Sequence, residues 1–73
     1  MDEDYVIVKK FSDHLRDLRR KKGLTQEKLA ELADISYKNI QYLEAKKPTC
    51  PSLVTLHKLA KAFNISLSEL MRF

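Results

Sequence analysis

The residues best suited to chemistry lie close together in the middle of the chain, in the stretch that follows Ser36. A lysine there can donate to the O6 and N7 atoms of guanine, and a glutamine can pair with adenine. Two tyrosines add apolar rings for thymine methyl groups and hydroxyls for phosphates. These candidate base-reading residues are Tyr37, Lys38, Gln41 and Tyr42. The alternative is that they are solvated surface residues and that one tyrosine packs partly against the core.

A helix beginning at Ser36 would present all four of these side chains together. Ile40 and Leu43 are spaced to lie on one buried side of such a helix, so at about 100° per residue the other four point outward. A preceding helix, capped by Thr25, buries Leu29, Ala30 and Ala33. The small Ala30 allows the two helices to cross closely, and Asp34 tolerates the left-handed conformation that a tight turn between them needs.

The rest of the chain shows helical spacing almost throughout, and only residues 5–8 resemble a short strand. A first helix has an apolar stripe and ends at Gly23, a fourth runs from the Ser52 cap to Asn64, and the capping box Ser66–Glu69 opens a fifth. The apolar positions expected to face the core are Val8, Phe11, Leu15 and Leu18 in the first helix, Leu53, Leu56, Leu59, Ala60 and Phe63 in the fourth, and Leu70 in the fifth. The fold class is therefore all-α, a compact five-helix bundle.

Composition limits what this bundle does. The 73 residues make one domain with a net charge of +4, and residues 9–22 hold seven basic side chains against two acidic ones. Such a balance favours a polyanionic partner. His14 and His57 lack neighbours at metal-ligand spacing, one glycine cannot build a phosphate loop, and no catalytic arrangement is present, so we expect neither enzyme activity nor a cofactor or metal. The single Cys50, the acidic start and the lack of a long apolar run favour the cytoplasm and argue against a membrane.

The run Leu24–Ala30 (Leu-Thr-Gln-Glu-Lys-Leu-Ala), followed downstream by Leu43-Glu44, resembles the Cro/C1-type (Xre-like) helix-turn-helix family. The similarity extends from about residue 11 to residue 71, so residues 1–10 are interpreted as an N-terminal extension and residues 11–73 as the family's domain. The resemblance implies a phage-repressor-like DNA-binding fold in which the second and third helices form the helix-turn-helix. Two positions depart from the family pattern, because Asp34 and Lys46 stand where glycine is usual.

The resemblance also implies roles for individual residues. The third helix would read bases, Arg19 would form a structural ion pair with Glu44, and free N–H groups at helix starts would face phosphates. The expected phosphate-binding residues are Thr25, Gln26, Ser36, Lys46 and Lys47. The alternative for Lys46 and Lys47 is that they are solvated surface residues. Arg16 and Arg20 of the first helix could also contact DNA. The alternative is that they form ion pairs with Asp13 and Asp17, each three residues earlier.

The C-terminus carries more apolar side chains than one short helix needs. These are Leu67, Leu70, Met71 and Phe73. They either complete the small core or form a dimer interface, and we favour the dimer because symmetric pairs are the commonest assembly. The two recognition helices of such a dimer should lie about 34 Å apart, the spacing of successive major grooves.

The sequence thus predicts a transcriptional regulator, a repressor or a controller-type protein, that binds double-stranded DNA as a homodimer on an inverted-repeat operator. Phosphate contacts would supply salt-dependent affinity, and the third helix would supply sequence preference. The alternative is an antitoxin or another protein-interaction module built on the same fold, with residues 1–10 as its partner-binding segment.

Overall fold

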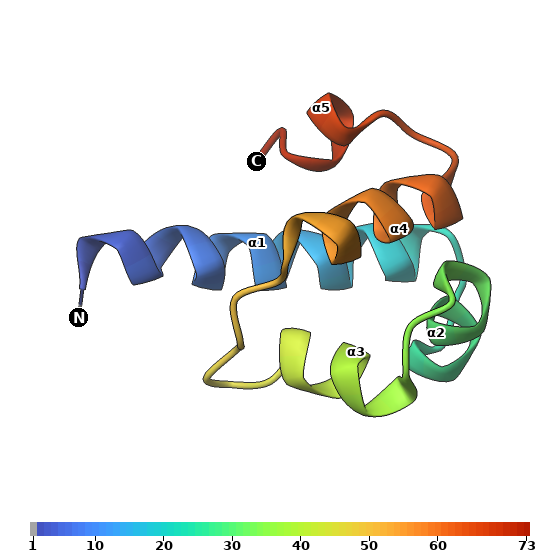
Figure 1. The fold of residues 1–73 in the computed structure, drawn as a ribbon, viewed down its shortest axis with the longest axis horizontal. Coiled ribbons are helices and arrows are strands. Elements are labelled where there is room, and N and C mark those ends of the chain that lie inside the picture. Colours follow the sequence, from blue (N-terminus) through green and yellow to red (C-terminus); the bar gives the residue numbers. More distant parts are fainter. Residues whose placement is uncertain (1) are drawn as a thin grey trace.

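The computed structural model describes residues 2–73, and the expected five helices are present in them. They are α1 (Glu3–Lys21), α2 (Gln26–Ala33), α3 (Tyr37–Leu43), α4 (Leu53–Phe63) and α5 (Leu67–Leu70). Figure 1 shows α1 crossing the molecule, with α3 on one side of it and α5 with the C-terminus on the other. No helix among residues 2–73 is both long enough and apolar enough to span a membrane. The all-α fold class is confirmed.

Helices α2 to α5 each begin at a hydroxyl side chain that satisfies a backbone N–H left free at the helix start. Each hydroxyl accepts a hydrogen bond, 3.0–3.1 Å long, from the backbone N–H three residues further on. The four capping residues are Thr25, Ser36, Ser52 and Ser66, as predicted. At α5 the Glu69 carboxylate also accepts from the backbone N–H of Ser66, which completes the predicted capping box.

The same turn joins α2 to α3 and α4 to α5. Asp34 and Asn64 end their helices in the left-handed region, at φ 56° and 57°. The isoleucine that follows each of them donates its N–H to a carbonyl in the last turn of the helix, Ile35 to Ala30 and Ile65 to Ala60, both at 3.0 Å. A serine cap comes next in both cases. Both predicted left-handed turns are confirmed, and an aspartate takes the place usual for glycine without changing the turn.

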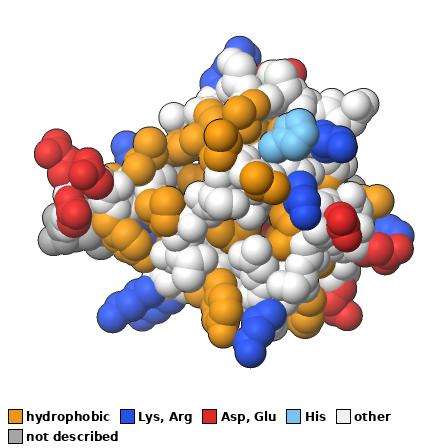
Figure 2. All heavy atoms as spheres, viewed as in Figure 1, with side chains coloured by type: hydrophobic (Ala, Val, Ile, Leu, Met, Phe, Trp, Pro, Cys, Tyr) orange, Lys and Arg blue, Asp and Glu red, His pale blue; other side chains and the backbone are white. Residues whose placement is uncertain are grey.

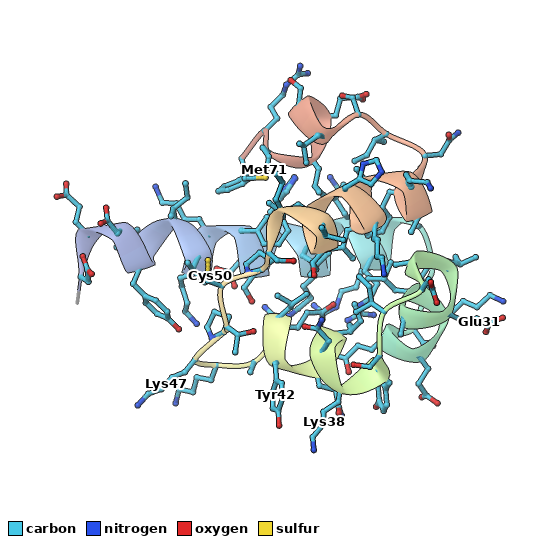
Figure 3. The ribbon with its side chains drawn as sticks, in the orientation of Figure 1. Glu31, Lys38, Tyr42, Lys47, Cys50 and Met71 are labelled. Atoms are coloured by element: carbon cyan, nitrogen blue, oxygen red, sulfur yellow. The ribbon has the colours of Figure 1, made fainter. Side chains whose placement is uncertain are left out.

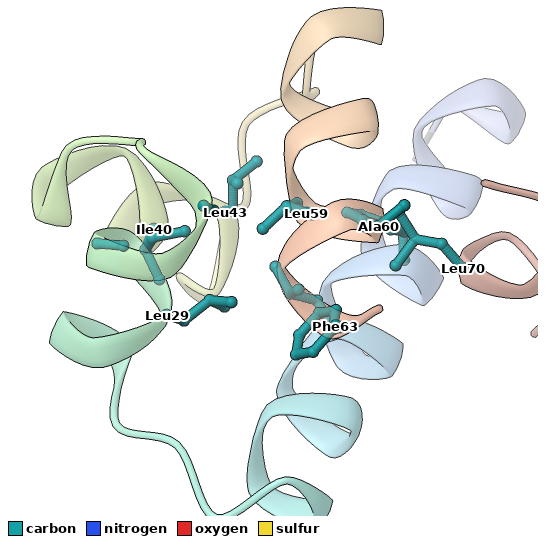
Figure 4. Packing of buried hydrophobic residues seen from close by; sticks show 11 residues of the cluster. Leu29, Ile40, Leu43, Leu59, Ala60, Phe63 and Leu70 are labelled. Carbon is teal, nitrogen blue, oxygen red and sulfur yellow. The ribbon is translucent and has the colours of Figure 1, made fainter. Parts of the chain in front are cut away.

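One apolar core holds all five helices together, and Figure 4 shows its α2, α3 and α4 side chains meeting one another. Its buried members are Phe11 and Leu15 from α1, Leu29, Ala30 and Ala33 from α2, Ile40 and Leu43 from α3, Leu59, Ala60 and Phe63 from α4, and Leu70 from α5. Several, including Leu15, Leu29, Ile40 and Leu59, have no exposed surface. The core therefore fixes α3 to the body of the domain through α2 and α4.

Two sequence expectations about this architecture are corrected. Residues 5–8 are helical rather than strand-like, because α1 begins at Glu3, and residues 3–10 continue without a break into the rest of that helix. Leu53 does not face the core, since its side chain is 70% exposed at the first position of α4. A residue in the first turn of a helix can point past the edge of the element it packs on, and helical spacing alone does not reveal where that edge lies.

Candidate nucleic-acid interface

Helix α3 is held by its buried side and presents its other side to solvent. Ile40 and Leu43 are 0% and 1% exposed, which anchors this seven-residue helix from behind. The four predicted base-reading residues, Tyr37, Lys38, Gln41 and Tyr42, are all exposed. Neither tyrosine is tucked into the core, since 43% and 49% of their surfaces are accessible. In Figure 3, Lys38 and Tyr42 project to the same side, away from the rest of the domain.

A buried carboxylate ties the end of α3 to α1 and α2. The Glu44 side chain is 1% exposed, and Arg19 donates to both of its oxygens, from Nε at 2.8 Å and from Nη2 at 2.9 Å. Arg19 also donates to the carbonyl of Leu24 at 2.8 Å. The hydrogen bonds to Glu44 raise the pKa of the Arg19 guanidinium above its ordinary value, so the arginine stays charged. The predicted ion pair of Arg19 with Glu44 is confirmed.

Two further side chains contact Glu44 that the sequence did not indicate. Gln26, the first residue of α2, donates its amide to Oε1 of Glu44 at 3.2 Å. Arg16 donates to the Glu44 backbone carbonyl at 2.7 Å and to Asp13 at 3.3 Å, so the predicted i, i+3 pair accounts for only part of its role. The C-terminal ends of α1 and α3 and the N-terminal end of α2 therefore meet at one carboxylate.

The other expected phosphate-binding residues lie near α3 in different settings. Thr25 and Ser36 are exposed at the starts of α2 and α3, and each accepts a backbone hydrogen bond as a cap. Lys46 and Lys47 are exposed in the segment after α3, and Lys47 points to the same side as Lys38 and Tyr42 (Figure 3). Exposed hydroxyl side chains thus stand at the starts of α2 and α3, and exposed lysines follow the end of α3.

The segment after α3 also makes contacts with α1 that lay outside the sequence analysis. The Tyr5 hydroxyl donates to the carbonyl of Pro48 at 2.8 Å, and Lys9 Nζ donates to the carbonyl of Lys46 at 2.9 Å. The backbone N–H of Thr49 returns to the carbonyl of Tyr42 at 3.2 Å. These partners are 37 or more residues apart between α1 and the loop, so no local pattern could have identified them.

The four C-terminal residues predicted for a dimer interface divide into two groups. Leu67, Met71 and Phe73 are exposed, at 38%, 38% and 46%. The prediction of Leu70 as an interface residue is wrong, because its side chain is 0% exposed and belongs to the protomer's own core. The turn at Asn64 folds α5 back against α4, which buries Leu70 and leaves its neighbours outside.

The exposed C-terminal side chains continue into a larger apolar surface. A shallow groove of about 110 Å³ lies beside Met71 and is lined by Ile7, Val8, Phe11, Cys50, Pro51 and Leu56 as well. Figure 2 shows hydrophobic side chains spread over this face, between the N-terminal half of α1 and the C-terminal segment. The face lies beside the side from which Lys38 and Tyr42 project, not on it.

The fold and the outward-facing third helix define a helix-turn-helix DNA-binding domain. A family model described as helix-turn-helix matches residues 15–70. The chain therefore belongs to the Cro/C1-type (Xre-like) helix-turn-helix family of DNA-binding transcriptional regulators, a class that is not enzymatic. The resemblance inferred from the sequence is confirmed. Among residues 2–73 there is no cluster of histidine, cysteine, aspartate and glutamate of a kind that could hold a metal ion.

Individual relatives agree with this placement. The chain is 38% identical over 55 residues to the HTH-type transcriptional regulator PuuR of Escherichia coli (strain K12), covering 75% of this chain and 29% of PuuR. It is 36% identical over 61 residues to the cryptic phage CTXphi transcriptional repressor RstR of Vibrio cholerae, covering 84% of this chain and 54% of RstR. This chain thus spans under a third of PuuR and about half of RstR.

A solved structure is similar over almost the whole chain. It is the crystal structure of the restriction-modification controller protein C.AhdI from Aeromonas hydrophila, with a TM-score of 0.83 and 39% sequence identity. The similarity covers 90% of this chain and 98% of that one. The arrangement of helices is therefore shared with a controller protein of nearly the same extent.

Proposed function

We propose that this chain is a cytoplasmic transcriptional regulator, of the repressor or controller type, that binds an inverted-repeat DNA operator as a homodimer. The observation that carries the proposal is the side of α3 that bears Tyr37, Lys38, Gln41 and Tyr42. An α-helix fits the major groove, and the residues nearest its start make most contacts with base edges. The buried side of α3 fixes where those residues point.

The phosphate contacts would come from the starts of α2 and α3 and from the segment after α3. Thr25 and Ser36 stand at helix starts, where backbone N–H groups and the helix dipole favour an anion. Lys46 and Lys47 follow the helix and are both exposed, and Lys47 points to the same side as Lys38 and Tyr42. Gln26 keeps one amide hydrogen and its carbonyl oxygen for DNA, because only one bond to Glu44 engages it. Such contacts supply affinity that falls as salt is raised.

The homodimer would form through the apolar face beside α3. Leu67, Met71 and Phe73 are its C-terminal part, and the groove against Ile7 and Pro51 continues it. A two-fold axis that lies in this face and runs along the direction in which Lys38 and Tyr42 project would leave both copies of α3 on the same side of the dimer, as docking into successive major grooves about 34 Å apart requires. Met71→Asp should shift the chain to monomers in sedimentation equilibrium. Leu32→Asp, at an exposed leucine of α2, is the matched control and should leave the assembly unchanged.

Selection of bound sequences from a random duplex DNA pool at physiological salt tests the proposal. An enriched inverted repeat with half-sites one helical turn apart supports it in full. A single enriched half-site supports base reading but contradicts the dimeric operator. If no sequence is enriched and the chain instead co-purifies with a protein ligand, the antitoxin or interaction-module function replaces the one proposed.

Lys38→Ala tests base reading by α3 on the selected operator. The variant should bind about 1–3 kcal/mol more weakly and accept other bases at one position of each half-site. Lys61→Ala removes the same charge from an exposed position in the last turn of α4 and should leave the base preference intact. An unaltered preference in Lys38→Ala would remove this lysine from base readout.

A further inference from the structure

A notch bordered by three lysines, with a wall that is almost entirely apolar, lies between the N-terminal half of α1 and the loop after α3. Its volume is about 440 Å³, and Tyr5, Lys9, Lys46 and Lys47 line it. Tyr5 and Lys9 precede the region that matches the family model, which begins at residue 15. The notch therefore combines two residues from outside the shared motif with two from the loop that ends the helix-turn-helix.

The three lysines that border the notch form no ion pair within the part of the chain that the structure describes. The ion pairs among residues 2–73 involve Arg16, Arg19 and Lys28, whereas none of the three notch lysines has a carboxylate within 4 Å. Lys9 gives one hydrogen bond to the carbonyl of Lys46, and an ammonium group has three donors, so two stay available. All three lysines border this notch, and an anion within reach of their ammonium groups would be attracted to each of them.

The walls of the notch are fixed relative to α3. The hydrogen bond from Tyr5 to the buried Pro48 ties the loop to α1, and the bond from Thr49 to the Tyr42 carbonyl ties it to the last turn of α3. The loop lysines are thus held at a set distance from the exposed residues of α3. A duplex that meets Lys38 and Tyr42 would extend along the side to which Lys47 also points (Figure 3).

We propose that Lys9, Lys46 and Lys47 together bind one backbone phosphate of the DNA duplex that α3 engages. Lys9 is the new element, a phosphate contact contributed by α1 from outside the shared motif. The ligand is a phosphate rather than a base because ammonium groups act as compact point charges and carry no pattern that distinguishes base edges. This inference rests on the proposed DNA-binding function and adds a contact to it.

Lys9→Gln and Lys10→Gln provide a matched test, since both remove one charge from adjacent positions of α1. Lys10 points elsewhere, to the surface formed with Glu3, Val6 and Phe73. Each phosphate contact adds about 0.9 to the slope of log affinity against log salt. We expect Lys9→Gln to lower that slope, by at most about 0.9 because Lys46 and Lys47 still face the phosphate, so that between 50 and 200 mM salt the unaltered protein loses up to about 3.5-fold more affinity than the variant. Lys10→Gln should keep the full slope.

Two more variants separate a phosphate contact from a role in bracing the loop. Tyr5→Phe removes the hydrogen bond to Pro48 but no charge, and Lys9→Arg keeps the charge; both should retain the slope. A slope that falls in Tyr5→Phe as much as in Lys9→Gln would mean that loop position, not the Lys9 charge, matters, and would overturn the inference. Thermal unfolding of each variant checks that the fold is intact; if Lys9→Gln does not fold, Lys9→Met takes its place.

A neutral backbone supplies the direct test. Replacing single operator phosphates by methylphosphonates should reveal one position whose neutralisation weakens binding of the unaltered protein more than binding of Lys9→Gln. If the protein binds duplex DNA and no such position exists, the notch does not bind a phosphate while the proposed function stands. If the protein binds no duplex at any salt concentration, both proposals are wrong.

Discussion

Arg19→Met should lower the free energy of unfolding by about 3 kcal/mol. Methionine keeps most of the apolar stem but removes three hydrogen bonds, two of them to the buried carboxylate of Glu44. Breaking a buried ion pair by removing one partner costs about 3–5 kcal/mol, because the remaining charge is left uncompensated. Gln26 and Arg16 still contact Glu44, which places the expected loss at the lower end of that range.

The size of this loss makes it easy to measure. A domain of this length has a total stability of about 4–11 kcal/mol, so the variant would lose a large share of it. For a domain of this size, 3 kcal/mol corresponds to a fall in Tm of roughly 12–24 °C. Urea unfolding followed by far-UV circular dichroism gives the free energy directly. Arg20→Met is the control, since the neighbouring arginine is exposed and its loss should change stability by under about 0.5 kcal/mol.

A second substitution identifies the cause of the destabilisation. In Arg19→Met combined with Glu44→Leu, no buried charge is left unpaired, and replacement of a whole buried pair by apolar side chains is often neutral or stabilising. The double variant should therefore be more stable than Arg19→Met alone. If Arg19→Met costs less than about 1 kcal/mol, or if the double variant is the less stable of the two, then an unpaired buried carboxylate is not the cause of the destabilisation.

Three further outcomes are expected from other parts of the fold. Leu59→Ala should cost about 2–5 kcal/mol in urea unfolding, because this side chain has no exposed surface and its truncation leaves a cavity; unchanged stability would contradict the facing of α4. Asp34→Gly should raise stability by about 0.5–1 kcal/mol by the same method, since φ is 56° there, whereas a loss would show that the aspartate is not strained. Hydrogen bonds from the Ser66 backbone N–H and hydroxyl lower the pKa of the Glu69 carboxyl, so an NMR titration should give a midpoint below the ordinary glutamate value. Because the folded pKa is the lower one, this group stabilises the fold fully above its unfolded pKa, and the contribution disappears as pH falls through the folded pKa; a midpoint at the ordinary value would contradict the capping box.

Local signals explain why so much of the fold was predictable. A hydroxyl side chain just before a run with helical apolar spacing predicts a cap, because the first backbone N–H groups of a helix have no partner within the helix. Each of the four predicted caps forms its hydrogen bond. Asp34 and Asn64 were identifiable because few residue types accept a positive φ. Burial of Ile40 and Leu43 followed from helical spacing alone. These features depend on residues fewer than five positions apart.

Features that depend on distant parts of the chain were less accessible. Leu67, Leu70 and Met71 are all apolar and close in sequence, yet only Leu70 is buried, because the path of α5 over α4 decides which one faces inward. The contacts of Tyr5 and Lys9 with the loop join positions 43 and 37 residues apart. The pairing of Arg19 with Glu44 came from the family resemblance, since no spacing rule links positions 25 residues apart.

The way α3 is held separates stability from sequence preference. An isolated helix of seven residues is not stable in water, so its position must come from tertiary contacts. Those contacts use Ile40 and Leu43 on its inner side and Glu44 at its end, and the local cap at Ser36 adds to them. None of the outward side chains at positions 37, 38, 41 and 42 takes part in them. Substitutions at the outward positions can therefore alter which bases are preferred at little cost in stability, whereas substitutions at the anchoring positions should disturb both the fold and the orientation of the helix.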